Sequence, residues 1–153
     1  MSAERFTLDT NILVYAFDSG DATRRKTARL VLDAARKADC VLTAQSLGEF
    51  FNVARRKLDL ALPELTSQIR DWMAMFRIAG ASEAAVRVAL EQVEAERFSY
   101  WDALLLSAAE QAGCSFCLSE DMAEGARLGA LTIHNPFTPA GQLSAKARGL
   151  LAL

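Results

Sequence analysis

The most telling part of the sequence is its first strand-like segment, Phe6-Thr7-Leu8-Asp9-Thr10-Asn11-Ile12-Leu13-Val14. An apolar run there stops at the carboxylate of Asp9, and two small polar side chains follow it. A buried parallel strand reads as a near-continuous apolar run, and open α/β sheets bind ligands at the carboxyl ends of such strands. Asp9 is therefore either a chemical group at the edge of a sheet or a cap for the turn that follows it.

Helical and strand patterns alternate along the rest of the chain. Helices are expected at 22–38, 44–57, 63–76, 82–97 and 100–112, and strands at 40–43, 77–79, 116–118 and 131–133. Strands separated by helices pair in parallel through right-handed crossovers. The pattern thus predicts a three-layer α/β/α domain with a central, mainly parallel sheet. Because no linker or repeat interrupts it, we expect one domain over residues 1–153, with 138–153 as a C-terminal tail.

Composition narrows the class of protein. The chain has 153 residues, of which 52% are hydrophobic and 24% charged, so it can close a full core. It has no apolar run long enough for a membrane span and no signal-peptide pattern, so we expect a cytoplasmic protein. A net charge of −2 excludes a generally basic surface for nucleic acid. Two local clusters, which include Arg24, Arg25, Arg55 and Arg56, remain as candidates for RNA contact or as solvated helix faces.

The cysteines and the single histidine favour structural roles. Cys114 and Cys117 form a C-x-x-C motif, but the preceding Gly113 ends a helix and the motif leads into a strand, unlike a redox-active pair at a helix N-terminus. Zinc needs about four ligands, and only Cys40 and His134 remain to complete a set. We therefore expect reduced, structural thiols and a packed or hydrogen-bonded histidine.

Three further carboxylates occupy positions from which they can converge on Asp9. In the helix at 44–57, the apolar stripe is Leu47, Phe50, Phe51, Ala54 and Leu58, and the opposite side carries Gln45, Glu49, Asn52 and Arg56. Asp102 falls in the first turn of the helix at 100–112, and Asp121 follows the strand at 116–118. Each acid also has a purely structural interpretation: Glu49 as a solvated residue, Asp102 as part of a capping box, and Asp121 as a turn former.

The four acids have a stronger interpretation as a group. Carboxylates brought together without a lysine or arginine raise one another's pKa and destabilise the fold, so such a cluster is expected chiefly around a cation. Oxygen ligands without histidine or thiolate suit Mg²⁺ or Mn²⁺. Such an ion activates water and stabilises a leaving oxygen, and the sequence therefore predicts metal-assisted phosphodiester hydrolysis.

Four blocks of the sequence resemble, in order and spacing, those of PIN domains, and in particular those of the VapC-type toxins of bacterial toxin–antitoxin pairs. The blocks are Leu8-Asp9-Thr10-Asn11-Ile12-Leu13-Val14, Gln45-Ser46-Leu47-Gly48-Glu49-Phe50, Tyr100-Trp101-Asp102-Ala103-Leu104-Leu105 and Leu118-Ser119-Glu120-Asp121-Met122. The resemblance extends from about Phe6 to Phe137.

This resemblance implies an α/β/α fold and a Mg²⁺- or Mn²⁺-dependent endoribonuclease. Asp9, Glu49, Asp102 and Asp121 match the family's catalytic and metal-binding acids, while the matching polar positions that steady them are Thr10, Asn11 and Ser119. Glu124 is a possible fifth carboxylate without a matching position. The implied partners are an RNA substrate, a cognate antitoxin and a second copy of the chain in a homodimer.

Other interpretations of the same residues are weaker. Phosphatases of the haloacid dehalogenase type need a second acid where this chain has Asn11, and no G-x-G-x-x-G follows the first strand to indicate a dinucleotide site. A non-catalytic PIN-like module that binds RNA or protein stays open as the alternative, although the presence of all four acids argues against it.

Overall fold

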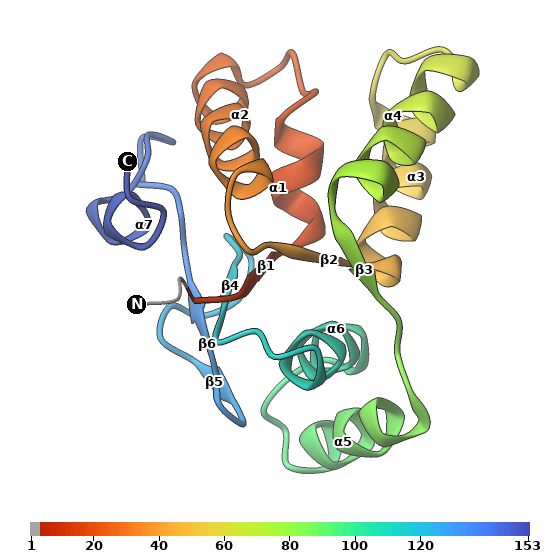
Figure 1. Cartoon of the computed structure of the whole chain (residues 1–153), viewed down its shortest axis with the longest axis vertical. Coiled ribbons are helices and arrows are strands. Elements are labelled where there is room, and N and C mark those ends of the chain that lie inside the picture. Colours follow the sequence, from red (N-terminus) through yellow and green to blue (C-terminus); the bar gives the residue numbers. More distant parts are fainter. Residues whose placement is uncertain (1–3) are drawn as a thin grey trace.

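The computed structural model describes residues 4–153, in which a sheet is flanked by helices (Figure 1). The elements, in chain order, are β1 (Phe6–Leu8), α1 (Thr10–Tyr15), α2 (Ala22–Arg36), β2 (Val41–Thr43), α3 (Ala44–Lys57), α4 (Leu62–Met75), β3 (Arg77–Ala79), α5 (Glu83–Glu94), α6 (Tyr100–Gln111), β4 (Phe116–Leu118), β5 (Arg127–Leu128), β6 (Leu131–His134) and α7 (Ala145–Leu150).

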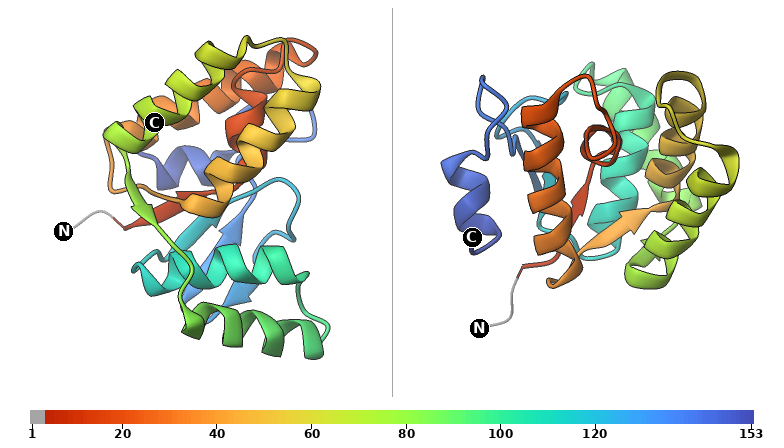
Figure 2. Two further views of the ribbon diagram at one scale, coloured as in Figure 1. Left: turned by 90° about the vertical axis from the view of Figure 1, so that its right-hand side faces the viewer. Right: turned by 90° about the horizontal axis from the view of Figure 1, so that it is seen from above.

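The sheet is mainly parallel, as predicted. One ladder has the order β1-β4-β6-β5, and a second joins β2 to β3. A parallel bridge between Phe6 and Cys40 links the two ladders, and among the strands of residues 4–153 only β5 and β6 pair antiparallel. In Figure 2 the helices α1–α4 cover one face of the sheet, and α5 and α6 cover the other. Leu8 pairs with Leu118 at the ends of β1 and β4, so the residues that follow these two strands emerge side by side.

Several helices begin directly after a residue whose side chain caps the helix N-terminus. Asp21, Thr43, Ser82 and Ser99 each accept a hydrogen bond from a backbone N–H in the first turn of the helix that follows. Such a cap satisfies one of the donors that a helix start leaves without a partner. α6 ends before Gly113, whose φ of +92° is costly for other residues.

Two apolar clusters fill the faces of the sheet. One lies under α1–α4 and is built around Phe6, Leu13, Phe50 and Trp72. The other lies between the sheet and α5 and α6, with Leu105, Leu106 and Ile133 among its buried residues. The two cores hold the strands in place. Asp9 and Asp121 follow the ends of β1 and β4, between the two cores.

The structure corrects several sequence-based expectations. The residues after Asp9 form the helix α1, a stretch for which no element was predicted, and β5 and α7 were not predicted either. α5 ends at Glu94 instead of near Arg97. Phe51, expected in the apolar stripe of α3, is 37% exposed. The tail packs on its own domain, since Leu143 and Leu150 contact the cluster under α1–α4.

The three cysteines are free and buried, as predicted. Burial raises the pKa of the Cys114 thiol to about 12 and that of Cys117 well above its ordinary value, so neither is a reactive thiolate.

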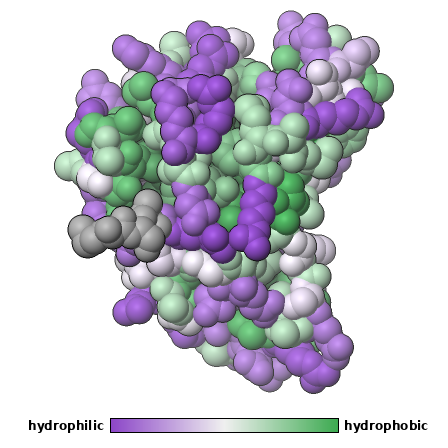
Figure 3. Space-filling model, viewed as in Figure 1, coloured by the Kyte–Doolittle hydropathy of each residue, from purple (hydrophilic) through white to green (hydrophobic). Residues whose placement is uncertain are grey.

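In Figure 3 the surface over α2 is mainly hydrophilic, as expected for an amphipathic helix with one buried face. Within residues 4–153, every helix is too short or too polar to traverse a bilayer.

Candidate active site

Asp9 lies at the junction of β1 and α1. Its backbone N–H donates to the carbonyl of Leu118 at 2.9 Å, which places it beside the end of β4. Its carboxylate accepts from the N–H of Thr10 at 2.7 Å and from the hydroxyl of Ser119 at 2.7 Å. Asp9 is therefore the N-cap of α1, and the residue is 7% exposed. The capping role and the proposed chemical role are compatible in this geometry.

Glu49 reaches the same region from α3. Its carboxylate accepts from the hydroxyl of Thr10 at 2.8 Å and from Nε2 of Gln45 at 2.6 Å. Thr10 thus contacts both acids, Asp9 through its backbone N–H and Glu49 through its side chain. The polar side of α3 accordingly faces other residues of the site rather than only solvent.

Asp102 lies in the first turn of α6, where its N–H donates to the capping hydroxyl of Ser99 at 3.2 Å. Nε2 of Gln45 donates to the carbonyl of the preceding Trp101 at 2.9 Å, so one glutamine connects α3 to the start of α6. Gln45, Glu49, Trp101 and Asp102 line a hollow of about 440 Å³. Sequence reasoning did not predict a role for Gln45, because its contact with Trp101 depends on how two helices far apart in the chain meet, and only its contact with Glu49 is local.

Asp121 follows β4 in an exposed bend, and Ser119 anchors the start of that bend by donating its N–H to the carbonyl of His134 at 3.0 Å. The four acids are close enough to act on one another. Burial raises the pKa of Asp9 from 3.8 to about 6, and the charges of Asp102 and Asp121 add to the rise. Burial also raises the pKa of Asp102, with further contributions from Glu49 and Asp121.

The cluster has no ion-pair partner in the described part of the chain. Among residues 4–153, no lysine, arginine or histidine forms an ion pair with Asp9, Glu49, Asp102 or Asp121. Like charges gathered in this way cost stability unless a cation binds them.

The donor set suits a hard divalent ion that keeps part of its water shell. All the candidate ligands are carboxylate oxygens, which Mg²⁺ and Mn²⁺ prefer. No three acidic, histidine or cysteine side chains within the described part of the chain are arranged to hold an ion directly. Because Mg²⁺ commonly binds through one or two carboxylates and several waters, the residues fit a hydrated ion rather than a closed cage.

Asn11, near Asp9 in the chain, carries a side-chain amide without a partner among the described residues. Both its side-chain amide atoms are buried and have no hydrogen-bond partner among residues 4–153. A buried polar group without a partner costs roughly 1–3 kcal/mol, which ordered water or a bound polar ligand would recover. Asn11 lies two residues after Asp9, at one of the predicted supporting positions.

A set of contacts that sequence reasoning missed holds the bend beside Asp121. The carboxylate of Glu120 accepts from the Tyr15 hydroxyl at 2.5 Å and from Nε of Arg24 at 2.9 Å. Arg24 also pairs with Asp21 at 3.1 Å and lies over the ring of Tyr15. We call Tyr15, Arg24 and Glu120 the Glu120 clamp. The guanidinium of Arg24, predicted as an RNA contact, is thus engaged inside the protein.

The remaining predicted residues lie as follows. Glu124 bonds to Nδ1 of His134 at 3.0 Å and to the N–H of Asn135 at 2.6 Å, so its carboxylate caps a neighbouring segment. His134 is hydrogen-bonded, as predicted. Three of the four candidate arginines form no ion pair within residues 4–153. These three are Arg25, Arg55 and Arg56.

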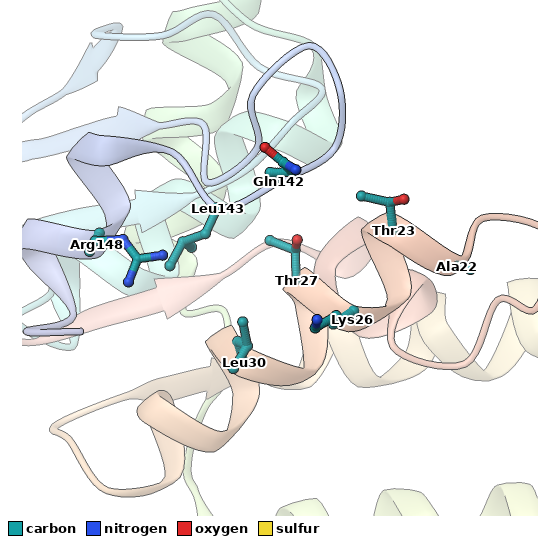
Figure 4. A pocket seen from close by; sticks show the side chains of 8 residues that line it. All are labelled: Ala22, Thr23, Lys26, Thr27, Leu30, Gln142, Leu143 and Arg148. Atoms are coloured by element: carbon teal, nitrogen blue, oxygen red, sulfur yellow. The ribbon is translucent and has the colours of Figure 1, made fainter.

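A different hollow, of about 510 Å³, lies between α2 and the C-terminal segment. Figure 4 shows Lys26 and Thr27 of α2 facing Gln142 and Arg148 across it. No carboxylate lines this hollow, and none of the four acids contributes to it. This hollow is larger than the one lined by Glu49 and Asp102, but it lacks the acids on which the candidate active site is built.

Comparisons with known proteins identify the family and the fold. The sequence profile described as "PIN domain" matches residues 6–123. Among curated proteins, none matches the chain. The fold is similar to that of VapC20 from Mycobacterium tuberculosis, described as a toxin that cleaves the sarcin-ricin loop, with 19% identity, a TM-score of 0.61 and coverage of 76% of this chain and 89% of that one.

Two complexes with DNA contain chains of the same fold. For VapBC2 of Rickettsia felis, bound to a promoter fragment, identity is 20%, the TM-score is 0.62, and the match covers 86% of this chain and 98% of that one. For VapBC of Salmonella typhimurium, identity is 15%, the TM-score is 0.60, and the match covers 88% and 98%. At these identities the likeness establishes the fold, which confirms the three-layer prediction.

Proposed function

Because the chain belongs to the PIN-domain family, we propose that it is a metal-dependent endoribonuclease and the toxin of a toxin–antitoxin pair. The observation that carries the proposal is the acidic cluster. The charges of neighbouring acids of the cluster contribute to the raised pKa values of Asp9 and Asp102, and no cationic side chain of residues 4–153 pairs with any of the four. The similarity in fold to VapC-type toxins supports the proposal.

We assign the residues as follows. Asp9, Asp102 and Asp121, with Glu49, would hold Mg²⁺ or Mn²⁺, partly through water. The bound ion supplies an activated water and charge stabilisation for the leaving oxygen of a phosphodiester. Ser119 and the N–H of Thr10 fix the orientation of the Asp9 carboxylate. Thr10 and Gln45 hold Glu49 toward the site.

RNA cleavage by the purified protein tests the activity. With total cellular RNA, we expect cleavage in Mg²⁺ or Mn²⁺ that stops in EDTA and falls by orders of magnitude in Asp121→Asn. Glu94→Gln, which neutralises an exposed acid at the end of α5, is the matched control and is expected to cleave at the wild-type rate. A metal-dependent thermal shift without any cleavage of RNA would favour the non-catalytic alternative.

We further propose that a cognate antitoxin inhibits the enzyme and that the chain forms a homodimer. An arginine or lysine of the antitoxin, lying across the acids, would substitute for the cation. Antitoxin binding should then weaken as Mg²⁺ is raised at constant ionic strength. An affinity that does not depend on Mg²⁺ would place the inhibitor outside the acidic cluster. Light scattering of the purified chain tests the dimer.

A further inference from the structure

Trp101 is the most exposed large apolar residue between residues 4 and 153, at 63%, whereas the chain's other tryptophan, Trp72, is 3% exposed. Single exposed apolar residues are common on protein surfaces, so exposure alone indicates nothing. The position of Trp101 is what distinguishes it. It immediately precedes Asp102 and lines the hollow that contains Glu49.

The surroundings hold Trp101 in place. Nε2 of Gln45 donates to its backbone carbonyl at 2.9 Å, and the same nitrogen donates to Glu49. The ring of Tyr100 meets the indole edge to face, with centroids 5.0 Å apart and an interplanar angle of 88°. An aromatic pair of this geometry is favourable, and it limits the orientations available to the indole. An exposed aromatic ring is thus fixed beside the proposed metal-binding acids.

We infer that Trp101 is a stacking platform for one unpaired RNA base next to the scissile phosphate. The inference rests on the proposed function and adds the class of substrate. If the phosphate lies at the acids, the neighbouring base lies within reach of residues that line the same hollow. Base stacking on an aromatic side chain tolerates any base, but it requires a base that is not already stacked in a duplex. The substrate is then RNA with an unpaired nucleotide at the cleavage site.

The environment of Trp101 favours a base over an apolar anchor from a protein partner. Its neighbours in the hollow are an amide and two carboxylates, which suit the polar edges of a base. A mainly apolar hollow of about 420 Å³ lies elsewhere, between α3 and α4, and includes Phe51, Ile69 and Met73. An apolar protein anchor would find more contact there than at Trp101.

The test uses the intrinsic fluorescence of tryptophan. Because Trp72 is buried, a change on adding RNA reports on Trp101. The probe is a short oligouridylate added in Mg²⁺ to the Asp121→Asn protein, in which turnover is blocked. We expect quenching by the single strand and much less by the same strand annealed to oligoadenylate. Absence of quenching by the single strand would overturn the inference.

Variants separate stacking from a structural effect. In the same Asp121→Asn background, Trp101→Ala should weaken binding of the labelled oligouridylate roughly 5- to 150-fold, the range expected for one stacked base. Trp101→Phe should keep most of that affinity and lose the quenching. Leu90→Ala, at a 49% exposed apolar residue of α5, is the control and should bind normally. Unchanged melting temperatures would show that the variants fold.

The outcomes distinguish this inference from the proposed function. If the otherwise wild-type protein cleaves RNA and Trp101→Ala does so with the same KM and kcat, the stacking role is wrong and the nuclease assignment stands. If neither protein cleaves or binds RNA, the proposed function fails and this inference fails with it. If Trp101→Ala changes only the oligomeric state or the binding of a protein partner, Trp101 is a protein contact and the inference is overturned.

Discussion

At the residue scale, Asp9 combines two roles that sequence reasoning treated as alternatives. It caps α1 through Oδ1, and the pKa of its carboxylate is also raised, by burial above all and further by the charges of Asp102 and Asp121. An aspartate followed by Thr and Asn is typical of a cap, so the local pattern alone cannot reveal the second role. Only its combination with three distant acids does so.

The raised pKa of Asp9 predicts how the metal-free protein responds to pH. Its folded-state pKa of about 6 exceeds the ordinary 3.8, so the folded protein binds the proton more tightly than the unfolded chain does. The ionised carboxylate therefore costs stability above pH 6. That cost disappears as the pH falls through 6 toward 4, and a shift of this size corresponds to at most about 3 kcal/mol.

Asp9→Asn tests this prediction, because asparagine retains capping ability and has no charge. In EDTA, the variant's free energy of unfolding minus that of the wild type should decrease as the pH is lowered from 7 to 4. Urea unfolding at both pH values measures the difference. A difference that does not change with pH would show that Asp9 keeps an ordinary pKa.

At the element scale, most of the fold follows from local patterns. The predicted helix at 44–57 coincides with α3, and the strands at 77–79 and 116–118 coincide with β3 and β4, because periodicity and capping residues mark their ends. α1 was missed because its six residues make less than two helical turns, too few for a helical period to appear. β5 has only two residues, too few for any period to appear.

The candidate site is predictable only in part for a related reason. The acids fall in four recognisable blocks, but the contacts that hold them join residues far apart in the chain. Glu120 meets Arg24 and Tyr15 across 96 and 105 positions, and Gln45 meets Trp101 across 56. No local pattern specifies such pairings, since they depend on how α2, α3 and α6 pack against the strands.

The Glu120 clamp predicts that Arg24 acts through the bend that carries Asp121. Arg24→Gln removes the ion pair to Glu120, and we expect cleavage to slow about tenfold or more because the neighbouring acid is displaced. The dependence of the rate on salt should stay that of the wild type. A lower salt dependence, with the loss of rate largest at low salt, would instead make Arg24 a phosphate contact.

At the scale of the whole molecule, charge distribution matters more than net charge. A chain of net charge −2 with an acidic centre repels RNA there, so phosphate contacts must come from basic residues around it and from the metal. Arg25, Arg55 and Arg56 are the predicted contacts that form no ion pair within the described residues.

Reversing the charges of Arg25, Arg55 and Arg56 tests this prediction. Arg24, which is adjacent to Arg25 but paired with Glu120, provides the contrast. Arg25→Glu, Arg55→Glu and Arg56→Glu should each weaken cleavage of different RNAs about equally, since phosphate contacts carry no sequence information. A contributing arginine should also lower the slope of log affinity against log salt by roughly 1. If the triple variant keeps the wild-type rate and slope, RNA approaches by another face.

The central claim is that the acids form one divalent metal centre, and a Mn²⁺ titration monitored by thermal unfolding tests it most directly. At saturating metal, about 100 times Kd, binding adds about 2.7 kcal/mol, or roughly 5 to 10 °C for a chain of this size. We expect that shift in the wild type and in Glu94→Gln, and its loss in Asp9→Asn and Asp102→Asn. Equal shifts in all four proteins, or none in the wild type at millimolar Mn²⁺, would contradict the claim.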